Sequence, residues 1–167
     1  ADKIDIDWTN PQWLEVGLKY RYTNKDTLYF SAGWQDWSEF SKNQLAFSGG
    51  QLNPAVAMDR NFRDTWHAGF AYAHHMNESN VYSIAFAYDS SPVKDGDRTF
   101  DLPVEEIYKL SGSYSWKGKK KFDFTVGATL YLIGDAAIDQ TSQGVRVTGE
   151  FDNNTILFLG GTLRYRL

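Results

Sequence analysis

The stretch Val81–Tyr88, VYSIAFAY, alternates strictly between larger and smaller side chains. Its even positions hold tyrosine, isoleucine and phenylalanine, whereas its odd positions hold valine, serine and alanine. A period of two is typical of a β-strand, in which successive side chains point to opposite faces of the sheet. A strand that meets water on one face carries charged side chains there, and this stretch has none. Neither face of this strand therefore resembles the outer surface of a soluble β-protein.

The same alternation recurs in six further stretches, and the seven segments together predict an all-β chain. The six stretches cover residues 14–22, 27–35, 65–73, 108–116, 122–132 and 157–167. No stretch shows a comparable helical periodicity. All four prolines fall between the predicted strands, where a missing backbone N–H does no harm.

The connections between these segments alternate in length. Short polar turns are expected near residues 23–26, 76–79 and 117–120, and long loops near residues 38–63, 90–105 and 134–153. Antiparallel up-and-down strands would place all the short turns at one end of the sheet and all the long loops at the other. This asymmetry is typical of bacterial outer-membrane barrels.

Composition excludes several classes of protein. The 167 residues carry a formal net charge of −4, which argues against a nucleic-acid partner, and the lack of cysteine excludes disulfides and thiol chemistry. No run of about 18 apolar residues is present, so no transmembrane helix is expected. The mean hydropathy of −0.49 remains compatible with a membrane barrel, because alternating strands average apolar with polar positions.

Two interpretations of the strand faces compete. In a soluble barrel or sandwich, the large side chains form the core and the other face carries charges, but here that face holds mainly Ser, Ala, Gly, Thr and His. Aromatic residues also gather near both ends of the segments, as they do at two membrane interfaces. The pattern favours a transmembrane barrel whose large side chains face lipid. The alternatives are a small structural outer-membrane barrel and a soluble β-barrel that binds a lipid.

An ordered set of short motifs adds a family resemblance. YDSSPV begins at Tyr88, DRTFDLP at Asp97, LSGSYSW at Leu110 and GEFDNN at Gly149. From about residue 12 onward, this order resembles the C-terminal half of the FadL-type outer-membrane transporters of long-chain fatty acids and other hydrophobic compounds. The resemblance implies an antiparallel up-and-down transmembrane β-barrel in the bacterial outer membrane. It also implies passive uptake of a hydrophobic ligand.

The family's barrel has fourteen strands and an N-terminal hatch, so the seven segments correspond to about half of it. Residues 1–167 are expected to form a single β-barrel domain or a C-terminal half-barrel. A half-barrel has two open edges, whose N–H and C=O groups lipid cannot satisfy. Another chain could complete the barrel, the fragment could pair with itself, or residues 145–151 could add an eighth strand that closes a small barrel. We expect residues 145–151 to extend a strand at the outer end instead, because a full crossing would leave the C-terminus outside.

Transport of a hydrophobic carboxylate requires an apolar groove and a cation for the head group. The predicted capture groove comprises Phe47, Leu52, Val56 and Met58 in the first long loop. Its alternative is packing of loop on loop. Lys109, near the outer end of the lumen face, and Arg98, in the adjoining loop, are the candidate partners of the carboxylate. The alternative for both cations is an ion pair with Asp97 or Glu106.

No catalysis, cofactor or metal is expected. His74 and His75 are neighbours on a predicted strand and point to opposite faces, so they cannot chelate one ion together. Glu105 and Glu106 lie in a loop, where solvated charge is the ordinary role, and no G-x-S-x-G motif occurs. The expected partners are a long-chain fatty acid or another hydrophobic ligand, outer-membrane lipid, and a further chain that completes the barrel.

Overall fold

The computed structural model describes residues 3–7, 9–40, 44–48, 61–99, 102–118, 121–142 and 145–165. These residues are mostly β-structure, with one short helix. The elements are β1 (Lys3–Asp7), β2 (Trp13–Arg21), β3 (Asp26–Gln35), α1 (Trp37–Phe40), β4 (Gln44–Ser48), β5 (Thr65–His75), β6 (Asn80–Asp89), β7 (Ile107–Lys117), β8 (Phe122–Ile133), β9 (Ala136–Ser142), β10 (Val145–Phe151) and β11 (Thr155–Tyr165).

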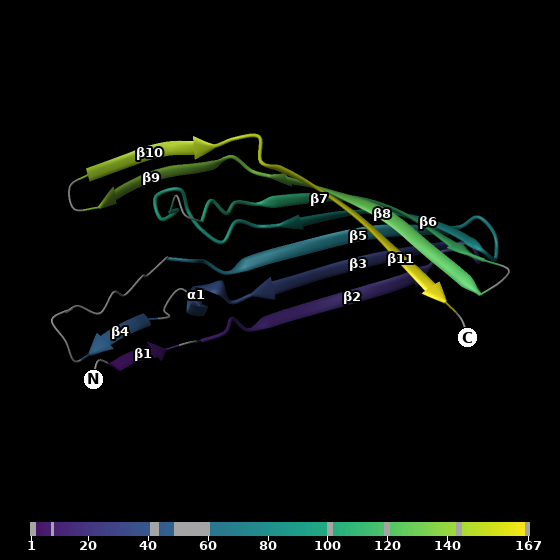
Figure 1. The fold of residues 1–167 in the computed structure, drawn as a ribbon, viewed down its shortest axis with the longest axis horizontal. Coiled ribbons are helices and arrows are strands. Elements are labelled where there is room, and N and C mark those ends of the chain that lie inside the picture. The colour runs from purple at the N-terminus through teal and green to yellow at the C-terminus, as the bar shows by residue number, and fades with distance from the viewer. Residues whose placement is uncertain are drawn as a thin grey trace.

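Seven long strands form one antiparallel sheet in the order β11-β8-β7-β6-β5-β3-β2. Its members pair in the order in which they follow one another along the chain, so the sheet is an up-and-down meander (Figure 1). These strands are the seven segments that the alternation predicts, and the predicted fold class is confirmed. Within the described part of the chain, β2 and β11 each pair with one strand only, so the barrel is not closed.

Polar side chains shape the short turns of the sheet. Between β2 and β3, the Thr23 hydroxyl accepts hydrogen bonds from the backbone N–H groups of Lys25 (3.1 Å) and Asp26 (3.0 Å). Between β5 and β6, the side-chain oxygen of Asn77 accepts hydrogen bonds from the N–H groups of Ser79 (2.8 Å) and Asn80 (2.9 Å). Turns of this kind hold the pairing register of the strands that they connect.

The long connections carry additional structure at the opposite end. β1 pairs with β4, and β9 pairs with β10, in two small antiparallel sheets. In Figure 1 both sheets lie on the left, away from the short turns and the C-terminus. β10 therefore confirms the prediction of a strand at the outer end over residues 145–151. The eight-stranded closed barrel is wrong, because this stretch folds back on β9 as a hairpin and does not join the long sheet.

The large apolar side chains of the sheet lie on its exposed face. On β5, β6 and β7 the even positions are the more exposed, and they include Trp66 (63%), Ile84 (56%) and Leu110 (46%). Few apolar residues of the described chain are buried, and those in the sheet are small. The alternative of a soluble β-barrel is therefore wrong, because such a protein would bury these side chains in its core. None of the helical residues described forms a segment long and apolar enough to cross a membrane.

Candidate functional site: the inner wall and the outer loops

The inner wall of the sheet is formed by the odd positions of β2, β3 and β5 to β8 and by the even positions of β11, and many of its side chains are small. Pairing places Gly17, Ser31, Gly69 and Ala87 in one row across four strands, and Lys109 on β7 is the next member of the row. A depression of about 470 Å³ lies over the small members of this row. One charged side chain, that of Lys19 on β2, borders this depression, and its ammonium lies 5.6 Å from the centroid of the Tyr29 ring. Such a surface suits a hydrophobic molecule with a polar group at one end.

Lys109 lies near the outer end of this wall, as predicted. Its ammonium forms an ion pair with Asp89 of β6 and lies 5.4 Å from the centroid of the Tyr131 ring of β8. Both charged side chains are partly exposed, at 29% and 30%. The predicted alternative named Asp97 or Glu106 as the acid, whereas the observed partner, Asp89, comes from the neighbouring strand. A ligand carboxylate would compete with Asp89 for the ammonium group.

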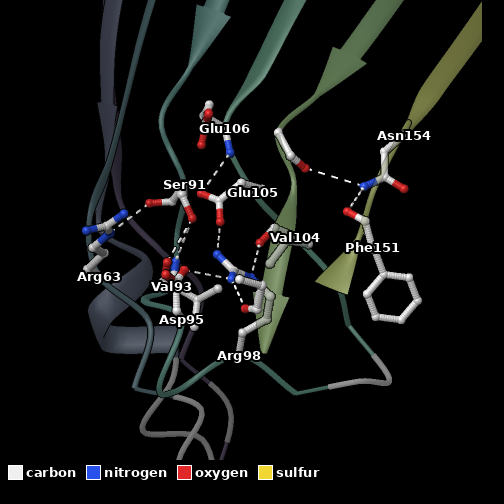
Figure 2. Close-up of polar contacts among 12 residues, drawn as sticks. Arg63, Ser91, Val93, Asp95, Arg98, Val104, Glu105, Glu106, Phe151 and Asn154 are labelled. Atoms are coloured by element: carbon white, nitrogen blue, oxygen red, sulfur yellow. Dashed lines mark hydrogen bonds and ion pairs between the residues drawn. The ribbon is translucent and has the colours of Figure 1, made fainter. Parts of the chain in front are cut away.

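Arg98 is almost fully buried, at 1% exposure. Figure 2 shows its guanidinium group surrounded by oxygen atoms of the loop between β6 and β7 and of β9. It forms ion pairs with Asp95 (2.8 Å) and Glu105, and it donates hydrogen bonds to the carbonyls of Val104 (2.9 Å) and Ala137. The acids paired with Arg98 are therefore Asp95 and Glu105, and not the predicted Asp97 or Glu106. The two candidate cations thus have separate acidic partners.

Arg98 belongs to an outer cluster of buried residues, which we define as Ser91, Val93, Arg98, Ala136 and Ile138. The Ser91 hydroxyl donates a hydrogen bond to the Val93 carbonyl (2.8 Å), and the Ser91 carbonyl accepts one from the Arg63 side chain (2.9 Å). The cluster therefore connects the loop before β7 both to β9 and to the segment that precedes β5. It is a small packed core at the outer end of the sheet.

The predicted capture groove falls mostly outside the described residues. Phe47 lies in β4, where its backbone pairs with that of Ile4 in β1. Leu52, Val56 and Met58 lie outside the residues that the structure describes. The groove therefore stays a prediction.

His67 occupies a notch in the inner wall that the sequence pattern does not reveal. Its Nε2 atom lies 3.9 Å from Oε1 of Glu15 on β2. A Cβ atom on Gly33, which lies between them on β3, would be 2.1 Å from Cε1 of His67 and 2.9 Å from the carbonyl oxygen of Leu14. Only glycine leaves room for the imidazole ring at this position.

A second polar group that sequence reasoning missed lies at the short-turn end, on the outward face. Oδ1 of Asp26 accepts a hydrogen bond from the Tyr72 hydroxyl (2.6 Å) and lies 2.6 Å from Nδ1 of His74. Asp26 and His74 are directly opposite each other on β3 and β5, so the strand pairing itself brings them together. Within the described ranges, no group of three or more His, Cys, Asp or Glu side chains could hold a metal ion.

Comparison with known proteins agrees with this architecture. The family model described as "Outer membrane protein transport protein (OMPP1/FadL/TodX)" matches residues 3–166. The crystal structure of a Pseudomonas aeruginosa FadL homologue matches with a TM-score of 0.73 and 17% identity, over 92% of this chain and 34% of that chain. A Neisseria meningitidis serogroup B protein named "Putative outer membrane protein" is 28% identical over 108 residues, which are 61% of this chain and 23% of the relative. The long-chain fatty acid transport protein of Escherichia coli is 20% identical over 126 residues, 75% of this chain and 28% of the relative.

This chain spans about a quarter of the length of these curated relatives. The structural match shows the barrel fold, of which the seven-stranded sheet is an unclosed part. The family and the Neisseria meningitidis relative are named as outer membrane proteins, in agreement with the predicted location. The chain therefore belongs to the OMPP1/FadL/TodX family of outer membrane transport proteins.

Proposed function

We propose that the protein to which this chain belongs takes part in the passive uptake of long-chain fatty acids or similar hydrophobic compounds. The observation that carries the proposal is the inner wall, where a row of small side chains leads to the ammonium group of Lys109. An alkyl chain lying over the small side chains would have its acidic head group beside this cation. The relative named as a long-chain fatty acid transport protein supports the same class of substrate.

Lys109 is the proposed first contact of the carboxylate on the wall, and Asp89 is the group that the ligand displaces. Replacing one carboxylate by another keeps the ammonium paired, and the displaced Asp89, whose side chain is 30% exposed, is solvated by water. Such exchange gives weak, reversible binding, which is what passage through a channel requires. Arg98, whose guanidinium group is buried beside Glu105, is the proposed second cation. The proposed capture groove at the outer end comprises Phe47, Leu52, Val56 and Met58.

A bulky substitution on each face of the sheet tests the uptake proposal. Ala87→Trp places an indole ring over the depression of the inner wall, whereas Ala68→Trp places the same ring on the face exposed to lipid. The intact transporter is produced at equal membrane levels in cells that lack their own uptake protein, and uptake of radiolabelled fatty acid is measured. Ala87→Trp should abolish most of the uptake and Ala68→Trp should preserve it. Equal uptake by both variants would refute the proposal.

The role of Lys109 has a separate test. Lys109→Met should weaken binding of a long-chain fatty acid to the intact transporter about tenfold, because a charge-assisted hydrogen bond is lost. Binding of the alcohol with the same chain length should not change, since it carries no charge. If acid and alcohol are affected equally, Lys109 does not recognise the head group.

A further inference from the structure

The lipid-facing surface of the sheet has a groove at its centre. Gly112 of β7 pairs with Ala128 of β8, and the larger Ile84 and Leu159 lie on either side of them in the same row. A groove of about 550 Å³ lies here, lined almost wholly by apolar atoms, and Leu110 forms part of its wall. A Cβ atom added to Gly112 would meet nothing within 4 Å, so the floor of the groove is open.

The position of the groove matches the middle of the hydrocarbon layer. Gly112 is midway along β7 between Tyr108 and Trp116, which belong to the aromatic residues at the two ends of the strands. Aromatic side chains at such positions mark the two membrane interfaces. The groove is therefore surrounded by lipid tails and not by head groups.

A cation lies on the same face at the short-turn end of β8. Nζ of Lys121 is 5.4 Å from the centroid of the Tyr165 ring, which is itself 5.1 Å from the ring of Phe122. About 23 Å of strand separates Ala128 from Lys121 at about 3.3 Å per residue, or about 16 Å along the membrane normal for a tilt of about 45°. Half of the hydrocarbon layer is about 15 Å thick. The groove and the cation are therefore one leaflet apart.

We propose that this face binds one glycerophospholipid of the periplasmic leaflet, with its acyl chain in the groove at Gly112 and Ala128 and its phosphate at Lys121. An apolar groove alone gains little in a membrane, because neighbouring tails are as apolar as leucine. The open groove adds dispersion contacts with a chain that fills it, and the ammonium adds a charge-assisted hydrogen bond to phosphate. Together these contacts distinguish one lipid from the bulk lipids around the barrel. The site does not depend on what the lumen carries.

Photo-crosslinking tests the site in the intact transporter. The protein is placed in nanodiscs of phosphatidylethanolamine and phosphatidylglycerol that contain a phospholipid with a diazirine near the end of one acyl chain. Crosslinks should map by mass spectrometry to the peptides around Gly112 and Ala128. The Cβ atom of Gly112→Leu meets nothing within 4 Å, and the leucine side chain should occupy the groove. This variant should reduce the crosslinking roughly tenfold, because the groove no longer provides its contacts to the acyl chain.

Two control variants match these substitutions. Gly160→Leu adds the same side chain at a strand glycine whose Cβ also meets nothing within 4 Å, but on the inner face, and should leave the crosslinks unchanged. Lys121→Ala should reduce the crosslinks, and Lys25→Ala, in the turn between β2 and β3, should not. Equal crosslinking in the wild type and Gly112→Leu would overturn the proposal. The proposal would also be overturned if free fatty acid abolished the crosslinks and unlabelled phospholipid did not. The groove would then bind the transported compound and not a membrane lipid.

Discussion

Replacing Arg98 by methionine should detach the outer loops while leaving the barrel wall folded. Methionine retains much of the volume of the side chain but removes its charge and every donor. The carbonyls of Val104 and Ala137 then lose their partners, and Glu105 loses its cation. All of these groups belong to the outer loops and β9, so the seven-stranded sheet keeps its own hydrogen bonds.

The magnitude follows from how deeply each acid is buried. The side chain of Glu105 is 11% exposed, so the substitution leaves a carboxylate that water barely reaches. Removing one member of a buried ion pair costs about 3–5 kcal/mol. The side chain of Asp95 is 67% exposed and adds little, since water can solvate it. At about 1.4 kcal/mol per factor of ten, local opening should become between about 100-fold and several thousand-fold more frequent.

Hydrogen–deuterium exchange of the intact transporter measures this opening directly. The N–H of Arg98 donates to the carbonyl of Lys94 (3.0 Å), and the N–H of Asp139 donates to the carbonyl of Asp95 (3.2 Å). Peptides that contain these amides should exchange faster in Arg98→Met, and peptides of β7 should not.

Two variants sharpen the test. Glu105→Gln combined with Arg98→Met removes the uncompensated charge and should restore part of the protection. Arg21→Met, at the short-turn end of β2, should leave the outer loops unchanged. If exchange in Arg98→Met rises less than tenfold, the buried guanidinium does not hold the loops together and our argument is wrong.

Three further outcomes are expected. A hydrogen bond from Arg146 keeps the pKa of Asp139 below its ordinary value of 3.8. The β9–β10 hairpin should therefore lose stability as the pH falls through that lowered pKa. Amide exchange should show this loss in the wild type but not in Arg146→Met. Leu159→Arg, in the middle row of the lipid-facing surface, should cost about 2–4 kcal/mol in urea unfolding from lipid bilayers, and Gly160→Arg on the inner face should cost much less. Equal losses would contradict the assignment of the faces. Gly33→Ala should cost about 1–3 kcal/mol in the same assay, because its Cβ atom would overlap the imidazole ring of His67 and the carbonyl oxygen of Leu14. Unchanged stability would contradict the close packing of His67 against Gly33.

The seven long strands could be predicted because their signal is local. Alternation in a stretch such as Val81–Tyr88 reports both the strand and the face of each side chain, whatever the partner strand is. β1, β4, β9 and α1 were not predicted. They are short, and β1 pairs with a strand from a distant part of the chain, so no periodic run of useful length marks either partner.

The environment of Arg98 shows why site residues were harder to predict than strands. The acids near it in the sequence made an ion pair foreseeable, but they did not indicate which of them would be buried with it. Its burial depends on a carbonyl of β9, which lies 39 residues further along the chain. Lys109 is similar, because its acid is supplied by the neighbouring strand β6. Contacts of this kind follow from the tertiary fold, and the sequence near the residue does not encode them.

The strand order has a consequence for whatever forms the remaining arc of the wall. Since the meander has an odd number of antiparallel members, its two border strands, β2 and β11, share one polarity (Figure 1). If two copies of this sheet formed a ring, β11 of each copy would lie parallel to β2 of the other copy at both junctions. In a wall that is antiparallel throughout, the first and last strands of the remaining arc must both run from the periplasm outward. The remaining arc therefore needs an odd number of strands. The complementary arc therefore has to be a stretch of opposite polarity and not a repeat of this one.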